Sequence, residues 1–233
     1  TYITELIEYL PPNKLEHKYK NEIHCNELAI LPYYIANLNI EFTYQQKMGV
    51  YEEFENICLV DTLEHSTFNN QQLDMLALSA KNTLRISKQN TKSISVIIGN
   101  PPYNAHQGDF SNRNANRAYK QVDKLIKNSY VQEGTAQNQI VVYDMYTRFI
   151  RWATERLGKQ GIIAFITNRS FVDSRTFDGF RKCVGRSFDY VYVVDTQSDV
   201  RNNPKISGTK NNVFGIQTGV AIIFLVKVSG NEA

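Results

Sequence analysis

The hydrophobic residues of this chain fall into two patterns that alternate along the sequence. In one, apolar residues recur every three or four positions, which predicts amphipathic helices at residues 3–10, 28–46, 140–157 and 176–184. In the other, short runs of apolar or β-branched residues predict strands at residues 23–27, 57–60, 94–98, 162–166, 190–194 and 220–228. The alternation predicts an α/β fold, with a mostly parallel sheet and helices on both faces.

Three stretches lack a strong pattern. Residues 11–21 begin with two prolines and are expected to form a polar loop, and residues 69–82 have only a weak helical pattern. Residues 104–138 are rich in Asn, Gln, Lys and Arg, and only residues 115–129 in them suggest a helix. Because this is too long for an ordinary loop of a compact α/β domain, we interpret it as a polar insertion that either carries function or is mobile.

Composition excludes several classes of protein. No apolar run approaches the roughly 20 residues that a membrane span needs, so no membrane partner is expected. The three cysteines are odd in number, lie far apart and form no C-x-x-C pair, which argues against disulfides and against a metal site, and favours a cytoplasmic location.

The charge is uneven along the chain. The net charge is +3, but residues 1–99 hold 8 basic and 12 acidic residues, whereas residues 100–233 hold 18 basic and 11 acidic ones. A basic half suits a polyanionic partner such as nucleic acid, although dispersed Lys and Arg also form an ordinary solvated surface. Five basic residues beyond residue 110 either contact the phosphate backbone of a nucleic acid or form a solvated helix surface. They are Arg113, Arg117, Lys120, Lys124 and Lys127.

Polar residues follow three predicted strands, at the edge where α/β sheets bind ligands. They are Glu27, Asp61 and the run Asn100-Pro101-Pro102-Tyr103. Two prolines stiffen the run and donate no hydrogen bonds, so its carbonyls and the Asn100 amide oxygen stay available as acceptors, with the ring of Tyr103 beside them. Such a run can hold a planar group that bears an NH2; the alternative is a proline turn with a packed tyrosine.

The run Ile97-Ile98-Gly99-Asn100-Pro101-Pro102-Tyr103 resembles the catalytic motif of S-adenosylmethionine-dependent amino-methyltransferases, in particular gamma-class adenine DNA methyltransferases. The same motif occurs in enzymes that methylate RNA adenine or protein glutamine. The resemblance implies a Rossmann-like methyltransferase fold, with Asn100, Pro101, Pro102 and Tyr103 as catalytic residues.

Further blocks, in order along nearly the whole chain, are similar to the methyltransferase of type ISP (single-polypeptide) restriction-modification enzymes. These blocks are residues 26–28, 31–36, 61–64, 168–171 and 214–220. The resemblance implies double-stranded DNA as partner and further nuclease, helicase and target-recognition domains in the same polypeptide. It also implies substrate contacts by Tyr103, Asn168, Arg169, Phe171 and Phe214, although Phe214 fits a buried strand edge equally well.

The resemblance implies S-adenosylmethionine as cofactor. Such enzymes bind it at a G-T-G-T turn followed by an aromatic residue, and Thr1-Tyr2 resembles only the end of that turn, so residues 1–233 are expected to be a methyltransferase fragment whose first strand and glycine-rich turn precede residue 1. Glu27 resembles the acid that binds the ribose, and Asp61, with Thr62, resembles the site of the adenine amine. The resemblance also implies cofactor contacts by Thr1, Tyr2 and Asn100. From the residues alone, Glu27 is equally a helix N-terminal acid and Asp61 a cap or turn.

The sequence therefore predicts a methyltransferase for the exocyclic amine of adenine in duplex DNA, without a metal. The amine lone pair is delocalised into the ring, and acceptors at Asn100 and Pro101 favour a more nucleophilic nitrogen. Because the duplex hides this amine, the base must be flipped out, with stacking on Tyr103 as compensation. The alternatives are methylation of RNA adenine or protein glutamine, and an inert DNA-binding fragment.

Overall fold

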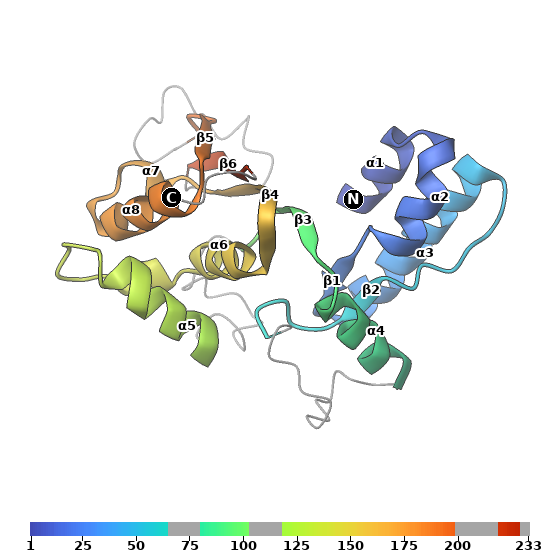
Figure 1. The fold of residues 1–233 in the computed structure, drawn as a ribbon, viewed down its shortest axis with the longest axis horizontal. Helices are drawn as coiled ribbons and strands as arrows, with labels where there is room; N and C mark the ends of the chain where they lie inside the picture. Colours follow the sequence, from blue (N-terminus) through green and yellow to red (C-terminus); the bar gives the residue numbers. More distant parts are fainter. Residues whose placement is uncertain (65–79, 103–117, 199–218, 229–233) are drawn as a thin grey trace. The chain divides into compact units, whose positions relative to one another are not determined.

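The computed structural model describes residues 1–64, 80–102, 118–198 and 219–228. The chain forms two compact units, Thr1–Lys92 and Ser93–Ala233 (Figure 1). No helix in the described ranges is long and apolar enough to cross a bilayer.

The N-terminal unit packs helices around a short parallel pair of strands. Its elements are α1 (Tyr2–Tyr9), α2 (Pro12–Asn21), β1 (Cys25–Glu27), α3 (Ile30–Met48), β2 (Ile57–Leu59) and α4 (Ala80–Asn90). β1 and β2 are parallel, with Glu27 opposite Leu59. The main core joins both strands to three helices through Ile7, Leu15, Tyr19, Ile23, Ile40, Tyr44, Phe54 and Ile57.

The prediction of a polar loop at residues 11–21 is wrong, because residues 12–21 form the helix α2. Pro12 stands in its first turn, where its missing N–H breaks no helical hydrogen bond. Only Leu15 and Tyr19, four residues apart, are buried. The other positions are polar, and pairs such as Lys20 with Glu16 lie one turn apart on the surface.

The predicted helix at residues 28–46 is confirmed as α3, but its apolar stripe points outward. Leu31, Ile35, Leu38 and Phe42 are 51–67% exposed, whereas the core takes Ile40 and Tyr44 from another face of the helix. Hydrophobic spacing therefore identified the helix but not the face that it buries.

The C-terminal unit is built on a four-stranded sheet with the order β3-β4-β6-β5. Its strands are β3 (Ile94–Gly99), β4 (Leu157–Asn168), β5 (Tyr190–Asp195) and β6 (Val220–Lys227), and its helices are α5 (Lys120–Ile126), α6 (Met145–Arg156), α7 (Ser170–Asp173) and α8 (Asp178–Ser187). Shorter helical turns are η2 (Lys127–Val131), η3 (Ile140–Tyr143) and η4 (Arg175–Phe177). β3 is parallel to β4, but β6 is antiparallel to both β4 and β5. This sheet is therefore mixed, and not mostly parallel as the sequence predicted.

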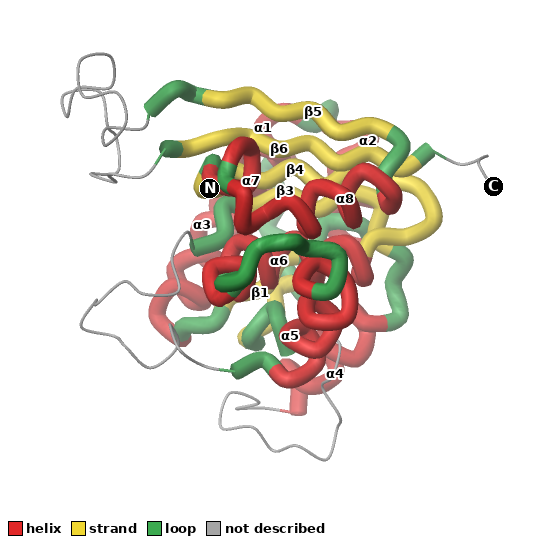
Figure 2. The backbone as a smooth tube through the Cα atoms, turned by 90° about the vertical axis from the view of Figure 1, so that its left-hand side faces the viewer, coloured by secondary structure: helices red, strands yellow, loops and turns green. Residues whose placement is uncertain are grey.

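The two faces of this sheet differ in burial. Ile163, Ile223 and Leu225 are at most 1% exposed on the face that α6, α7 and α8 cover (Figure 2). On the opposite face Val96 and Tyr192 are 59% and 57% exposed. Within this unit the described helices thus lie against one face, not against both faces as the sequence predicted.

Part of the stretch that its composition marked as polar belongs to the core. Tyr119, just before α5, and Val122, Ile126 and Tyr130 within α5 and η2 are buried, at helical spacing. The polar residues between them face outward, which is why composition alone suggested an insertion.

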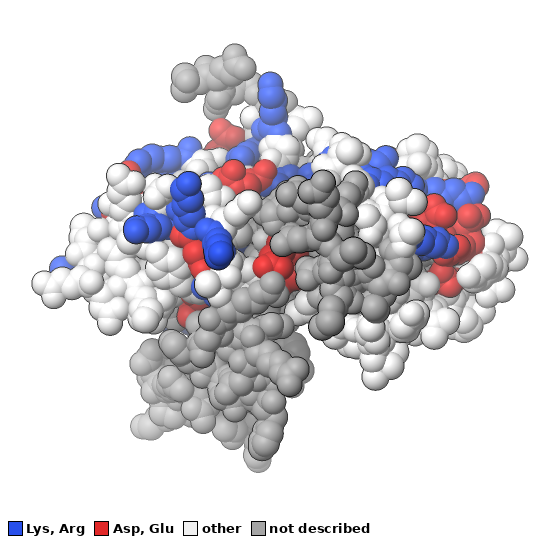
Figure 3. Space-filling model, turned by 90° about the horizontal axis from the view of Figure 1, so that it is seen from below, with Lys and Arg blue, Asp and Glu red and all other residues white. Residues whose placement is uncertain are grey.

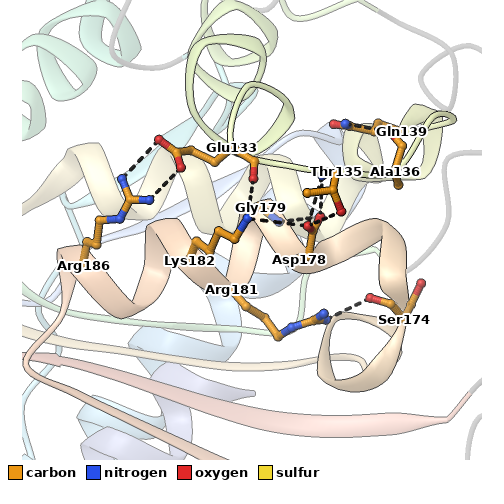
Figure 4. Close-up of polar contacts among 10 residues, drawn as sticks. All are labelled: Glu133, Thr135, Ala136, Gln139, Ser174, Asp178, Gly179, Arg181, Lys182 and Arg186. Atoms are coloured by element: carbon orange, nitrogen blue, oxygen red, sulfur yellow. Dashed lines mark hydrogen bonds and ion pairs between the residues drawn. The ribbon is translucent and has the colours of Figure 1, made fainter.

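A polar clamp holds the segment after η2 against α8 (Figure 4). The backbone N–H and the hydroxyl of Thr135 donate to the Asp178 carboxylate at 2.8–3.2 Å, and Arg186 donates two hydrogen bonds to Glu133. The hydrogen bond from the Thr135 hydroxyl is the main cause that lowers the pKa of Asp178. α8 is thus fixed against the backbone that follows η2.

This close approach predicts opposite effects for two glycines of α8. A Cβ at Gly179 would lie 2.0 Å from the Tyr130 carbonyl oxygen, whereas a Cβ at Gly185 meets nothing within 4 Å. We expect Gly179→Ala to lower the free energy of unfolding by about 2 kcal/mol or more, because backbone must move. Gly185→Ala is the control, and should leave stability unchanged or raise it by up to about 1 kcal/mol. Equal urea-denaturation midpoints for the two variants would contradict this packing.

Candidate functional site

In the N-terminal unit, Glu27 ends β1 and begins the turn into α3. Its Oε1 accepts hydrogen bonds from the backbone N–H groups of Leu28 and Ala29, at 2.9 and 3.1 Å. The positive end of the helix dipole favours a carboxylate at this position. No described residue engages the second oxygen, Oε2, so the carboxylate keeps an acceptor for a ligand.

Asp61 lies at the same edge, just beyond the neighbouring strand. The Val60 N–H donates to the Glu27 carbonyl at 2.9 Å, which continues the parallel pairing past the end of β2. Asp61 is 6% exposed, and its Oδ1 accepts a hydrogen bond from the Leu63 N–H at 3.0 Å. The structure therefore brings Glu27 and Asp61 to one sheet edge, as their places after strands predicted, and each also shapes the local turn.

Asn26 also belongs to this edge; it begins one of the blocks of resemblance, residues 26–28, but was not predicted as a site residue. Its Oδ1 is buried and has no hydrogen-bond partner among the described residues. A buried acceptor without a donor is costly, so it is a candidate for a ligand contact. The sequence feature that could have identified Asn26 is its position within a short strand, where Asn is uncommon.

The other expected cofactor residues lie at the start of α1 and in the turn after β2. Thr1 is the N-cap residue of α1. Burial raises the pKa of the Cys25 thiol in β1 to about 12. Tyr2 begins α1 and is 41% exposed, and Thr62 follows Asp61 in the turn.

The thiols of this unit have no nucleophilic role. Burial raises the pKa of Cys58 to about 12 as well, so both Cys25 and Cys58 are neutral at physiological pH. Among the described residues, no three His, Cys, Asp or Glu side chains gather closely enough to bind a metal.

In the C-terminal unit, the Asn-Pro-Pro run follows β3 directly. Asn100 and Pro102 are exposed and Pro101 is buried. In the described part of the chain, no hydrogen bond engages the Asn100 amide. A Cβ at Gly99 would lie 3.3 Å from the Phe165 ring, so a glycine lets β3 pass close to β4 just before Asn100.

Two of the expected residues, Tyr103 and Phe214, lie outside the described residues.

Asn168 ends β4, at the same sheet edge as Asn100 because β3 and β4 are parallel. It is 4% exposed, and its Oδ1 accepts hydrogen bonds from the Ser170 N–H at 2.8 Å and the Ser170 hydroxyl at 2.7 Å. Asn168 therefore caps the start of α7.

Arg169 and Phe171 are engaged within the protein. The Arg169 guanidinium donates to Asp195 at 3.1 Å and to Asp173 at 2.9 Å. Phe171 is 3% exposed and packs edge-on against Phe180. Asp195 was missed by the sequence reasoning, although it too directly ends a strand.

Acids at the ends of β1 and β2 and an Asn-Pro-Pro run after β3 are the features by which the sequence resembles a methyltransferase. Comparison with known proteins supports this class. The model of the Eco57I restriction-modification methylase family matches residues 14–200, and the chain belongs to this family.

Three solved structures are similar over nearly the whole chain. A DrdV–DNA complex is 51% identical with a TM-score of 0.87 over 97% of this chain, and the ATP-dependent type ISP restriction-modification enzyme LlaBIII bound to DNA is 35% identical with a TM-score of 0.83 over 98%. A nuclease-deletion mutant of the type ISP enzyme LlaGI, in complex with a DNA substrate mimic, is 33% identical with a TM-score of 0.84 over 98%. The chain spans only 22%, 16% and 19% of these proteins, respectively. No curated protein sequence matches the chain significantly.

The cap at Asn168 gives a prediction that separates a local structural role from a substrate contact. Asn168→Ala removes the acceptor of two hydrogen bonds, and should lower the free energy of unfolding by about 1–2 kcal/mol. Asn168→Asp keeps an acceptor at the same place and serves as the matched control in urea denaturation. If both variants unfold at the wild-type midpoint, Asn168 does not stabilise this corner.

Proposed function

We propose that this chain is the catalytic part of an S-adenosylmethionine-dependent methyltransferase, acting on the exocyclic amine of adenine in double-stranded DNA within a restriction-modification enzyme. The observation that carries the proposal is the Asn-Pro-Pro run after β3, whose Asn100 amide is exposed and unengaged by the described residues. Membership of a restriction-modification methylase family and the similarity to enzymes solved with DNA support it.

The chemistry rests on acceptors that are held in place. Pro101 and Pro102 have no N–H and a fixed φ, so the run is stiff. Their nitrogens cannot donate hydrogen bonds to the carbonyl oxygens of the run. Asn100 Oδ1 and the Pro101 carbonyl accept the two protons of the target amine. This draws the nitrogen away from conjugation with the ring and aims its lone pair, so that catalysis is positioning and electrostatics.

The residues of the N-terminal unit fit the cofactor. The ribose hydroxyls and adenine amine of S-adenosylmethionine are hydrogen-bond donors, and the edge at β1 and β2 offers acceptors: the unengaged oxygen of Glu27, the orphaned Oδ1 of Asn26, and Asp61. When bound, the cofactor supplies the sulfonium methyl group that is transferred. Thr1, Tyr2 and Thr62 are proposed to complete this site, and the sheet around it to be Rossmann-like.

The target base must leave the duplex to reach Asn100. Flipping costs a few kcal/mol, and stacking on one aromatic ring returns about 1–3 kcal/mol. Tyr103, next to Pro102, is proposed to supply this ring, and Phe214 a second one. We do not propose that Arg169 or Phe171 contacts the substrate. Arg169 is paired with two acids, and Phe171 is buried.

The first prediction of this function concerns Asn100. Asn100→Ala removes one of the two acceptors, and should reduce methyl transfer to duplex DNA by about 100-fold or more, by analogy with the loss of one preorganised hydrogen-bonding group from an active site. Because Asn100 is exposed, the thermal unfolding midpoint should not change. Asn13→Ala, at an exposed position of α2, is the matched control and should transfer methyl groups at the wild-type rate. Wild-type turnover by Asn100→Ala would refute the role of this residue.

The second prediction concerns the cofactor site. Glu27→Gln keeps an oxygen that can accept from Leu28 and Ala29, but loses the charge that binds ribose hydroxyls strongly. We expect it to weaken S-adenosylmethionine binding, measured by calorimetry, by about tenfold. The free energy of unfolding should fall by no more than about 1 kcal/mol, the contribution of a charge at a helix N-terminus. Glu5→Gln, an exposed acid of α1, is the control. Equal affinity in Glu27→Gln and the control would remove Glu27 from the site.

A further inference from the structure

Three lysines form one face of α5 and its continuation. Lys120, Lys124 and Lys127 are all exposed and are spaced by four and three residues, so they lie one above another along the helix. We call these three residues the lysine stripe. It extends about 10 Å along the helix axis, the length of about three phosphate steps of one B-DNA strand.

Among the described residues, no acidic side chain pairs with the stripe. Asp123, the acid of the same helix, is turned inward, where it accepts hydrogen bonds from Arg148 at 2.7 and 3.1 Å. None of the three lysines forms an ion pair with a described residue. Nine other basic side chains of the described ranges pair with acids: Lys18, Lys20, Lys81, Arg85, Arg148, Arg151, Arg169, Lys182 and Arg186.

The helix that carries the stripe is firmly held. Val122 and Ile126 are 4% and 0% exposed on its inner side, and the Arg148 guanidinium lies 5.3 Å from the centre of the Tyr119 ring. The backbone at the three lysine positions is therefore fixed before any partner binds. A preorganised row of cations loses less entropy on binding than lysines on a mobile loop.

Basic side chains gather on the surface where α5 lies (Figure 3). Exposed Gln121 and Asn128 stand beside the stripe and add hydrogen-bond donors that suit phosphate oxygens. A regular row of unpaired cations with amide donors fits a regular polyanion better than it fits a single acidic side chain.

We infer that the lysine stripe binds the phosphate backbone of the duplex DNA substrate, as a contact that positions the duplex without reading its sequence. This inference rests on the proposed function, from which it takes the identity of the polyanion. Phosphate contacts by lysine make affinity depend on salt and add little sequence preference. The stripe would thus hold the duplex while the Asn-Pro-Pro run receives the base.

The test compares two triple variants of the protein in fluorescence-anisotropy titrations of a labelled duplex, at several salt concentrations. One variant is Lys120→Ala with Lys124→Ala and Lys127→Ala. The control removes the same charge elsewhere, at three exposed lysines without an ion pair among the described residues: Lys14, Lys88 and Lys159. Thermal unfolding of each variant verifies that it is folded.

We expect the stripe variant to lose at least about tenfold in affinity at low salt, equally for duplexes of different sequence. Its slope of log K against log salt should fall by about 2 to 3, since each phosphate contact contributes about 0.9. The control variant should keep the wild-type slope, and arginine at all three stripe positions should restore it, because the charge is restored.

Equal losses in the stripe and control variants would overturn the inference. So would a wild-type protein whose duplex binding does not depend on salt, or one that binds duplex RNA more tightly than DNA through the stripe. Methyl transfer at saturating DNA, measured on the same preparations, tests the proposed function separately. If the wild-type protein transfers no methyl group, and only the stripe variant shows a reduced salt dependence of DNA binding, the proposed function is refuted. The role of the lysine stripe in DNA binding is then still supported.

Discussion

A local constraint governs the candidate site: two prolines follow Asn100 at the point where β3 ends. They remove two N–H donors and fix two φ angles. The proline nitrogens therefore donate no hydrogen bond to the oxygens of the run. The Asn100 amide is accordingly exposed and unengaged among the described residues, while Pro101 is buried and anchors the run. Stiffness and free acceptors together are what a planar amine needs in order to be held for alkylation.

The same principle, polar groups at the ends of parallel strands, orders the other candidate residues. Glu27 and Asp61 follow the paired strands β1 and β2 and lie at one edge. Asn168 and Arg169 follow β4, but their polar atoms are used to cap α7 and to bind Asp173 and Asp195. A strand end thus offers a place for chemistry, and the bonds already made there decide whether the side chain is available for it.

Local features were predictable from the sequence, and long-range ones were not. The six predicted strands and the helix α3 follow from patterns within a few residues. α2 was missed because only Leu15 and Tyr19 are apolar and buried in a polar stretch. The outward face of α3, and the pairing of Arg169 with Asp195 26 residues away, depend on packing between distant segments, which hydrophobic spacing does not encode.

The most direct test of the central claim is the identity of the methylated product. The protein is incubated with duplex DNA and S-adenosylmethionine labelled in its methyl group, and the DNA is hydrolysed to nucleosides and separated. We expect the label in N6-methyladenine. Label in a cytosine derivative, label found only when RNA or protein replaces the DNA, or no label in any of these substrates would contradict it.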